Sequence, residues 1–211
     1  MLLRILCVMF VLIGYPSLSL SKIDSRINAY NVNPHVYQLA MKAYSRAKQK
    51  GVAKKPVVTI IDYSLPSTKP RLWVIDMAKN KVMFHTHVAH GSGSGENHAS
   101  RFSDVPGSYK TSIGVFVTGS TYQGKHGRTL TLHGLENGFN GNAHNRRIVI
   151  HAADYVNEGI IKSKGRLGRS QGCPALNHKV AQPIIQAIKD GSVVLAYYPD
   201  KNWLKRSTFV S

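Results

Sequence analysis

The sequence predicts a mostly β domain that carries a few helices. Seven short segments are rich in β-branched and aromatic residues, which favour strands. The segments between them are rich in Gly, Pro, Ser and Asn, the residues typical of turns. Helical spacing of apolar residues occurs in only two places. The 211 residues suffice for one domain with a hydrophobic core, and we expect that core to be built on a sheet.

The first 21 residues predict a secretory signal peptide. Arg4 supplies a basic start, residues 5–14 form an apolar core, and serines follow where a peptidase could cut. This apolar core is too short to span a bilayer, which requires about 20 residues. We therefore expect an exported chain, in the periplasm or cell envelope or secreted, with no stable membrane insertion after removal of residues 1–21.

An N-terminal helical segment, residues 22–55, is expected to follow. Asn33 suits an N-cap, Pro34 suits the first helical position, and Gly51 suits the stop after the helix. Apolar residues between them recur every three to four positions, as on one face of a helix. The spacing predicts a helix over 33–51 that serves packing. Whether the whole segment packs on the domain or tethers it is left open by the sequence.

Residues 56–199 form the main predicted domain. Its strands are expected at 57–63, 71–77, 81–90, 113–119, 128–134, 147–152 and 192–198. A second helix is expected at about 178–190, capped by Asn177 and bent near Pro183. The stretch "HGSGSGENHASRFSDVPGS" predicts a long loop, and long loops often carry function. Residues 200–211 are expected to form a C-terminal tail.

The chain is strongly basic. It has 28 Lys and Arg against 10 Asp and Glu, which gives a formal net charge of +18. Such a charge favours anionic partners. The basic residues form no single block and the chain carries an export signal, so nucleic acid is not an expected partner. A non-catalytic protein that grips an anionic wall polymer by charge is an alternative function.

The stretch "GRLGRSQGCPALN" contains Cys173, which becomes the sole thiol once Cys7 leaves with the signal peptide. An unpaired cysteine in an exported chain suggests a reactive thiol or an intermolecular disulfide, although free cysteines also act as small core residues. If Cys173 lies in the turn before the helix, the helix dipole should lower the pKa of its thiol. The backbone N–H groups of that turn could hold an oxyanion. These features suit acyl transfer by a nucleophilic cysteine, which requires a nearby base.

Of the ten histidines, His151 is the best placed candidate for that base. It ends the apolar strand 147–152, so its ring should emerge at a sheet edge, and the following residues can fold back to bring Cys173 close. A strand-end histidine is also often an ordinary hydrogen-bonding residue. His85 and His87 alternate along one strand, but a zinc site needs three or four ligands, so no metal is predicted.

The motif "IVIHAA", followed by "SQGCPALN", resembles the His…[Ser/Thr]-x-Gly-Cys signature of L,D-transpeptidase catalytic domains of the YkuD type. It is most similar to the branch whose nucleophile motif reads Ser-x-Gly-Cys-Pro-Ala. The segments "GVFVTGSTYQGKHG" and "LHGLENGFNGNAHNRRIVIHAADYV" resemble that branch too. The resemblance runs from about Pro56 to Pro199. It implies a YkuD-like catalytic domain of the β-sandwich type, with the N-terminal helix appended.

The resemblance implies that Cys173 is the nucleophile. His151 would be the base that takes the thiol proton or holds it in a thiolate–imidazolium pair. The carbonyl of Ala152 would orient the imidazole, with Asp154 as an alternative. The thiol and the imidazole supply the covalent chemistry, so no metal or organic cofactor is implied.

The resemblance also implies supporting residues around the nucleophile. Gly172 and the Cys173 amide would shape the oxyanion hole, and Ser170 would brace the turn. The better-known branch has His at the position of Gln171 and Arg at the position of Ala175, so the substrate pocket differs here. Five side chains are the candidates for substrate binding: His133, Asn137, Arg169, Gln171 and Tyr122.

The implied substrates are peptidoglycan stem peptides, and the implied intermediate is a thioester on Cys173. An amine of a second stem as acceptor would give a 3→3 cross-link. A lysine of an outer-membrane protein as acceptor would attach that protein to the wall. Water as acceptor would make the chain an L,D-carboxypeptidase or endopeptidase, which is the alternative within the same chemistry.

Overall fold

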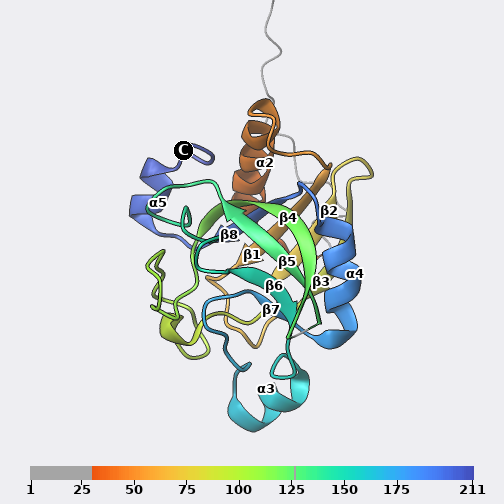
Figure 1. The fold of residues 1–211 in the computed structure, drawn as a ribbon, viewed down its shortest axis with the longest axis vertical. Coiled ribbons are helices and arrows are strands. Elements are labelled where there is room, and N and C mark those ends of the chain that lie inside the picture. The colour runs from red at the N-terminus through yellow and green to blue at the C-terminus, as the bar shows by residue number, and fades with distance from the viewer. Residues whose placement is uncertain (1–29, 126) are drawn as a thin grey trace, which may run out of the picture.

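The computed structural model describes residues 30–125 and 127–211, and eight strands in this part of the chain form one sheet. The sheet order is β3-β2-β1-β8-β4-β5-β6-β7. The strands are β1 (Val57–Asp62), β2 (Leu72–Asp76), β3 (Lys81–Thr86), β4 (Gly114–Gly124), β5 (Gly127–Gly134), β6 (Val149–Ala152), β7 (Ala175–Leu176) and β8 (Val193–Tyr197). The predicted mostly β class is confirmed (Figure 1). The predicted signal peptide lies outside the described residues.

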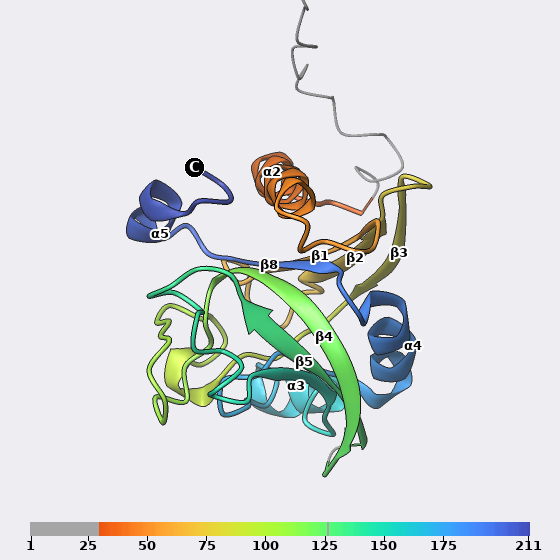
Figure 2. The ribbon, with the colours of Figure 1, turned by 45° about the horizontal axis from the view of Figure 1, so that its top comes forward.

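The sheet mixes parallel and antiparallel pairs. β1 pairs in parallel with β8, and β6 pairs in parallel with β7, while the other neighbours are antiparallel. Figure 2 shows that the sheet curls, so that β4 and β5 pass across one side of β1 and β8. Every residue of β1 and of β8 is buried, because both faces of these central strands are covered. This explains why both strands read as continuous apolar runs.

Helix α2 (Pro34–Gln49) covers the outer face of the sheet, opposite β4 and β5 (Figure 2). The Asn33 side chain caps it by accepting from the N–H groups of His35 and Val36, at 2.9 and 3.3 Å. Its buried face belongs to one hydrophobic core with residues of β1 and β8. The predicted helix is confirmed, and the open question is settled for the described residues: this part of the segment packs on the sheet.

Helix α4 (His178–Ile188) closes the second core, which lies inside the curl of the sheet. Asn177 caps it, as predicted, by accepting from the Lys179 N–H at 2.9 Å. Ile184, Ile185 and Ile188 are fully buried. They belong to the core that also contains apolar residues of β5, β6 and β8. The helix ends at Ile188, two residues before the predicted boundary. It packs against β6, the strand that contains His151.

The C-terminal residues do not form the predicted tail. They form helix α5 (Lys201–Arg206), whose Trp203 is completely buried in the outer core. The Trp203 indole N–H donates to the Glu136 carboxylate at 3.0 Å, and the Ser207 hydroxyl donates to the same carboxylate. Phe209 is buried as well. The segment is thus part of the domain, anchored by a buried carboxylate.

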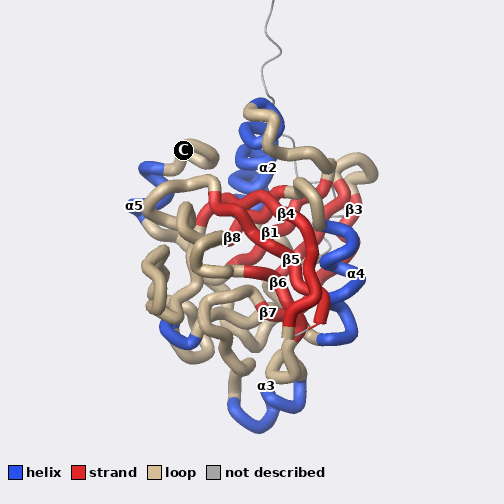
Figure 3. Tube along the Cα trace, in the orientation of Figure 1, coloured by secondary structure: helices blue, strands red, loops and turns tan. Residues whose placement is uncertain are grey.

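Two further differences lie on the way to the site. The residues between β6 and β7, expected to be loop-like, contain the short helix α3 (Glu158–Lys164), capped by Asn157 and ended by Gly165 with φ of +65°. The strand predicted to run to residue 90 ends at Thr86. Figure 3 shows long loops gathered beside β6 and β7. None of the helices in the described part of the chain is both long and apolar enough to cross a membrane.

Candidate active site

The turn that contains Cys173 lies against strand β6. In the parallel pairing of β6 with β7, His151 faces Ala175, two residues after Cys173. The Cys173 thiol lies 3.6 Å from the carbonyl oxygen of Arg147, just before β6. Cys173 and His151 line the same cleft, which has a volume of about 840 Å³. The fold therefore brings the predicted nucleophile and the predicted base to one cavity.

The imidazole of His151 is held in one tautomer. His151 is buried, and its Nδ1 lies 2.8 Å from the carbonyl oxygen of Ala152. A carbonyl oxygen only accepts, so Nδ1 carries the proton and Nε2 is the basic nitrogen. The Asp154 carboxylate lies instead 3.0 Å from the His178 imidazole, on the surface. The group that orients the His151 ring is thus the Ala152 carbonyl.

The expected effect of a helix dipole on Cys173 is wrong. Strand β7 and the cap residue Asn177 separate Cys173 from the first residue of α4. Burial raises the pKa of the Cys173 thiol, and a backbone hydrogen bond at Val149 and the Arg146 guanidinium only partly oppose this. The Cys173 S–H is 3.6 Å from the Arg147 carbonyl oxygen, to which it can donate.

Ser170 closes the nucleophile turn, residues 170–173, from both sides. Its hydroxyl donates to the Cys173 carbonyl at 2.7 Å and accepts from the Gly172 N–H at 3.0 Å. The Gly172 N–H is thus bonded to Ser170 within the turn. Of the two predicted groups, the Cys173 N–H is left as the candidate donor.

Gly172 cannot be replaced without strain. Its φ is +128°, a region that side chains rarely adopt. A Cβ there would lie 3.0 Å from Ile148 Cδ1 and 3.0 Å from the Lys110 carbonyl oxygen. The glycine thus allows the nucleophile turn to approach the neighbouring backbone closely.

Residues 89–92, which follow β3, hold the nucleophile turn in place. The Ser170 N–H donates to the His90 carbonyl at 3.0 Å, and the Ser92 N–H donates back to the Ser170 carbonyl at 2.8 Å. The Ala89 N–H donates to the Ala175 carbonyl at 2.9 Å. A Cβ on Gly91 would lie only 2.8 Å from Gly172 Cα, so the two segments are in direct contact. The first residues of the Gly- and Ser-rich loop, which starts at His90, thus hold the nucleophile turn in place by hydrogen bonds.

A buried Arg71–His90 pair lies behind this support. Arg71 is completely buried and donates to the Val88 carbonyl from Nε and Nη2, at 3.1 and 2.9 Å. Its Nη2 also lies 2.8 Å from Nδ1 of His90. A guanidinium only donates, so Nδ1 accepts and the imidazole is neutral. Burial and then the Arg71 charge lower the pKa of His90 to about 4. No sequence signal identified this pair.

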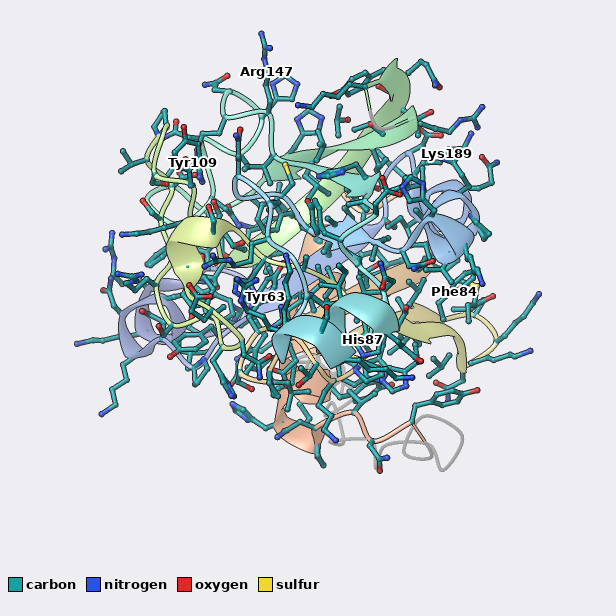
Figure 4. The ribbon with its side chains drawn as sticks, turned by 90° about the horizontal axis from the view of Figure 1, so that it is seen from below. Tyr63, Phe84, His87, Tyr109, Arg147 and Lys189 are labelled. Atoms are coloured by element: carbon teal, nitrogen blue, oxygen red, sulfur yellow. The ribbon has the colours of Figure 1, made fainter. Side chains whose placement is uncertain are left out.

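The cleft is basic. Four cationic side chains line it: Lys125, Arg146, Arg147 and Arg169. Among the described residues, no carboxylate lines the cleft. Figure 4 shows Arg147 extending outward from the body of the protein. Arg169 also pairs with Glu96, at 2.7 Å. The cleft thus suits a substrate that carries carboxylates.

Three of the five substrate-binding candidates lie at the cleft, namely Tyr122, Arg169 and Gln171. The other two do not. His133 is exposed and stacks on His144 with ring centroids 4.7 Å apart, and Asn137 lies in the exposed part of the loop after β5. Neither is among the residues that line the cleft.

Arg146 is a cleft residue that sequence reasoning missed. Its side chain is almost completely buried and donates to the Ser103 carbonyl at 2.7 Å, the Ser112 hydroxyl at 2.6 Å and the Lys110 carbonyl at 2.8 Å. The guanidinium therefore fixes the loop 103–112 that walls the cleft. The basic pair "RR" before β6 was the only signal in the sequence.

The histidines considered as metal ligands have other contacts. His85 stacks on Trp73 with centroids 4.9 Å apart, and Nε2 of His87 lies 3.1 Å from the Thr68 carbonyl. Across residues 30–125 and 127–211, no three His, Cys, Asp or Glu side chains gather as metal ligands would.

The curled β sheet carries a thiol and an oriented imidazole in one cleft, the two groups that acyl transfer by a cysteine requires. The family model for the L,D-transpeptidase catalytic domain matches residues 28–197. The chain therefore belongs to the L,D-transpeptidase catalytic domain family. No curated protein matches the sequence.

Solved structures of L,D-transpeptidases are similar to this chain at low identity. One from Mycobacterium smegmatis is 12% identical with a TM-score of 0.43, and the match covers 68% of this chain and 59% of that one. One from Mycobacterium tuberculosis H37Rv is 13% identical with a TM-score of 0.43, covering 68% and 58%. One from Stackebrandtia nassauensis is 15% identical with a TM-score of 0.41, covering 85% and 77%. This chain thus spans less than two thirds of the first two.

Proposed function

We propose that this chain is a cysteine-dependent L,D-transpeptidase that acts on peptidoglycan stem peptides. The observation that carries the proposal is the position of Cys173 and His151 in one cleft, with His151 Nδ1 held by the Ala152 carbonyl. This arrangement presents a basic nitrogen and a thiol to the same substrate. Family membership supplies the substrate class. We also propose that the chain works in the cell envelope after export.

The first half of the reaction forms a thioester. Nε2 of His151 takes the thiol proton as the Cys173 sulfur attacks the carbonyl carbon of the third stem residue. The π pair of the carbonyl moves onto its oxygen, and the Cys173 N–H donates a hydrogen bond to this oxyanion. When the oxyanion collapses, the bond to the terminal D-Ala nitrogen breaks, and that nitrogen takes the proton from the imidazolium. Thioester and free D-Ala result.

The second half transfers the acyl group. An acceptor amine attacks the thioester and gives a proton to His151, and collapse expels the sulfur, which takes that proton back. If the amine belongs to another stem, the product is a 3→3 cross-link. If it belongs to a lysine of an outer-membrane protein, that protein becomes attached to the wall. With water as acceptor, the same thiol performs hydrolysis.

Burial raises the pKa of the Cys173 thiol, which favours base catalysis by His151 over a preformed ion pair. Substrate carboxylates next to Arg147 and Lys125 would neutralise part of the charge of the cleft. We therefore assign His151 the role of taking the proton during attack, when the donor peptide occupies the cleft.

A muropeptide assay tests the proposal. Purified tetrapeptide muropeptides are incubated with the wild type and with Cys173→Ala, and the products are separated by liquid chromatography and mass spectrometry. Dimers from the wild type alone support transpeptidation, and trimmed monomers alone support the hydrolase. Salt-sensitive binding to sacculi that survives Cys173→Ala, without any turnover, would support a non-catalytic wall-binding protein.

Covalent labelling gives an independent test. The family resemblance implies slow acylation of Cys173 by carbapenems, which adds the mass of the drug to the intact protein. We expect this adduct on the wild type and none on Cys173→Ala. An adduct on the alanine variant would contradict the assignment of the nucleophile.

A further inference from the structure

The peptide units on both sides of Cys173 are held by side-chain hydroxyls. Ser170 holds the carbonyl of Cys173, as described above. The Thr111 hydroxyl donates to the carbonyl of Gly172 at 3.1 Å. Thr111 comes from the far end of the long loop and is only 2% exposed. The nucleophile is thus fixed from two directions by residues of different segments.

The Thr111 hydroxyl has a defined orientation. Its Oγ1 accepts from the Gly91 N–H at 2.8 Å, so its own proton is free to point to the Gly172 carbonyl. The Thr111 backbone N–H donates to the Ser94 hydroxyl at 2.8 Å. The Thr111 side chain therefore cannot turn away without losing two hydrogen bonds in a buried site, and its backbone is held by a third.

The contact to the Gly172 carbonyl also fixes the next amide. A trans peptide unit is planar, so its C=O and N–H point in opposite directions. Holding the Gly172 oxygen therefore sets the direction of the Cys173 N–H. A glycine at position 172 leaves this peptide unit free to rotate unless something holds it. The Gly172 N–H is bonded to Ser170, which leaves the Cys173 N–H as the donor to be aimed.

We propose that Thr111 is a positioning residue that aims the Cys173 N–H at the oxyanion of the acyl-transfer step. This inference rests on the proposed function, because it needs Cys173 to attack a carbonyl. Thr111 does not touch the reacting atoms. It acts through the Gly172–Cys173 peptide unit, and the sequence motif around Cys173 does not contain it.

Two reactions of the Cys173 thiol distinguish aiming of the Cys173 N–H by Thr111 from general structural support of the turn. An activated ester such as p-nitrophenyl acetate forms a bond from sulfur to the carbonyl carbon, passes through an oxyanion and expels p-nitrophenolate. Iodoacetamide forms a bond from sulfur to a saturated carbon and expels iodide, with no oxyanion. Only the first reaction depends on the direction of the Cys173 N–H.

The test compares Thr111→Val, which removes the hydroxyl at similar shape, with Thr111→Ser, which keeps it. We expect Thr111→Val to acylate about tenfold more slowly or worse with the ester, as for a misplaced oxyanion donor. We expect its iodoacetamide rate to stay within about twofold of the wild type, because alkylation needs no oxyanion. Thr111→Ser should recover most of the ester rate. Thr111→Ala provides a second variant without the hydroxyl if the valine variant folds poorly.

Ester acylation of Thr111→Val or Thr111→Ala at the wild-type rate would overturn the proposal. So would an equal loss in both reactions that Thr111→Ser does not recover, since that result indicates a displaced turn. Neither reaction uses peptidoglycan. A wild type that is acylated by the ester but turns over no muropeptide would contradict the proposed function and leave the result on Thr111 standing.

Discussion

The outer side of the sheet and the nucleophile turn are stabilised in different ways. On the outer side, apolar side chains of α2 and α5 form one core with residues of β1 and β8. Figure 2 shows both helices on this side of the sheet. On the site side, the nucleophile turn is held by hydrogen bonds from residues 89–92 and from Thr111. The first arrangement depends on buried apolar area and the second on the direction of individual donors and acceptors.

This difference separates stability from chemistry. Apolar packing contributes free energy of folding in proportion to the area it buries and tolerates small shifts. A hydrogen-bonded turn contributes less net free energy but fixes the direction of each group. We therefore expect changes on the outer side to lower stability with little effect on the rate per folded molecule. Changes at the nucleophile turn should lower the rate per folded molecule with little effect on stability.

The largest effect is expected for His151→Ala. The variant removes the basic nitrogen from the cleft, so turnover should fall about 10²–10⁴-fold, as for the loss of a general base. The measurement is dimer formation from muropeptides per mole of folded enzyme. His133→Ala is the matched control, because His133 is exposed and lies outside the cleft. Near-wild-type turnover of His151→Ala would contradict its role and move the base elsewhere, to His133 or His90.

The next effect tests the outer side. Trp203→Ala empties a completely buried site in α5 and breaks the contact to Glu136, so the free energy of unfolding should fall by about 3–5 kcal/mol. Urea unfolding measures this loss, and the ester reaction measures the rate per folded molecule. Lys205→Ala, an exposed change on the same helix, should alter stability by less than about 0.5 kcal/mol.

If Trp203→Ala instead left stability intact and slowed Cys173, the contrast between the two sides would fail. Glu136 makes this a demanding test, because it contacts the outer core and precedes the cleft residue Arg146 along the chain. Its carboxylate accepts from Trp203 and from the Val115 N–H, and it begins the loop that leads to Arg146.

The Arg71–His90 pair predicts an acid-dependent loss of stability on the site side. The pKa of His90 is lowered from 6.5 to about 4 in the folded chain. The unfolded chain therefore binds the proton more readily, and stability is full above pH 6.5 and falls as the pH drops toward 4. The wild type should lose about 3 kcal/mol over this range from His90 alone.

His90→Gln provides the comparison, because glutamine keeps an acceptor for Arg71 and does not titrate. Urea unfolding of both proteins at pH 7 and at pH 4 gives the difference. We expect the wild type to lose more stability than the variant on acidification. Parallel losses would show that His90 is not the group responsible.

The sequence predicted the two capped helices better than the contacts of the nucleophile turn, for a physical reason. Caps and apolar spacing are local, so Asn33 and Asn177 identified their helices directly. The class of the site followed from the motifs around His151 and Cys173. The α5 tail was misjudged because a six-residue helix has too few turns to show a period.

The missing residues of the site share another property. Arg71, Thr111 and Arg146 act through long-range hydrogen bonds to backbone carbonyls, and nothing in the local sequence marks the partner. Thr111, for example, lies 61 positions from Gly172 along the chain. The pKa of Cys173 was misjudged for a related reason: the two-residue strand β7, inserted before α4, removes the thiol from the helix N-terminus.

The smallest expected effect concerns the pH dependence of Cys173 alkylation, which tests whether the nucleophile turn ionises the thiol or only orients it. Because burial raises the pKa of the Cys173 thiol, the thiolate fraction at pH 7 should be lower than that of a free cysteine. Alkylation by iodoacetamide should then be slower than for free cysteine at pH 7. Its rate should still be rising above the ordinary thiol pKa of about 8.5.

A thiolate–imidazolium pair would give a different curve, with a plateau that begins below pH 7, because the thiol would already be ionised there. Free cysteine in the same buffers supplies the reference profile, and Cys173→Ala supplies the background. A rising curve would mean that the hydrogen bonds of the turn fix the direction of Cys173 without ionising it. The Cys173 thiol would then lose its proton to His151 only when it attacks the bound substrate.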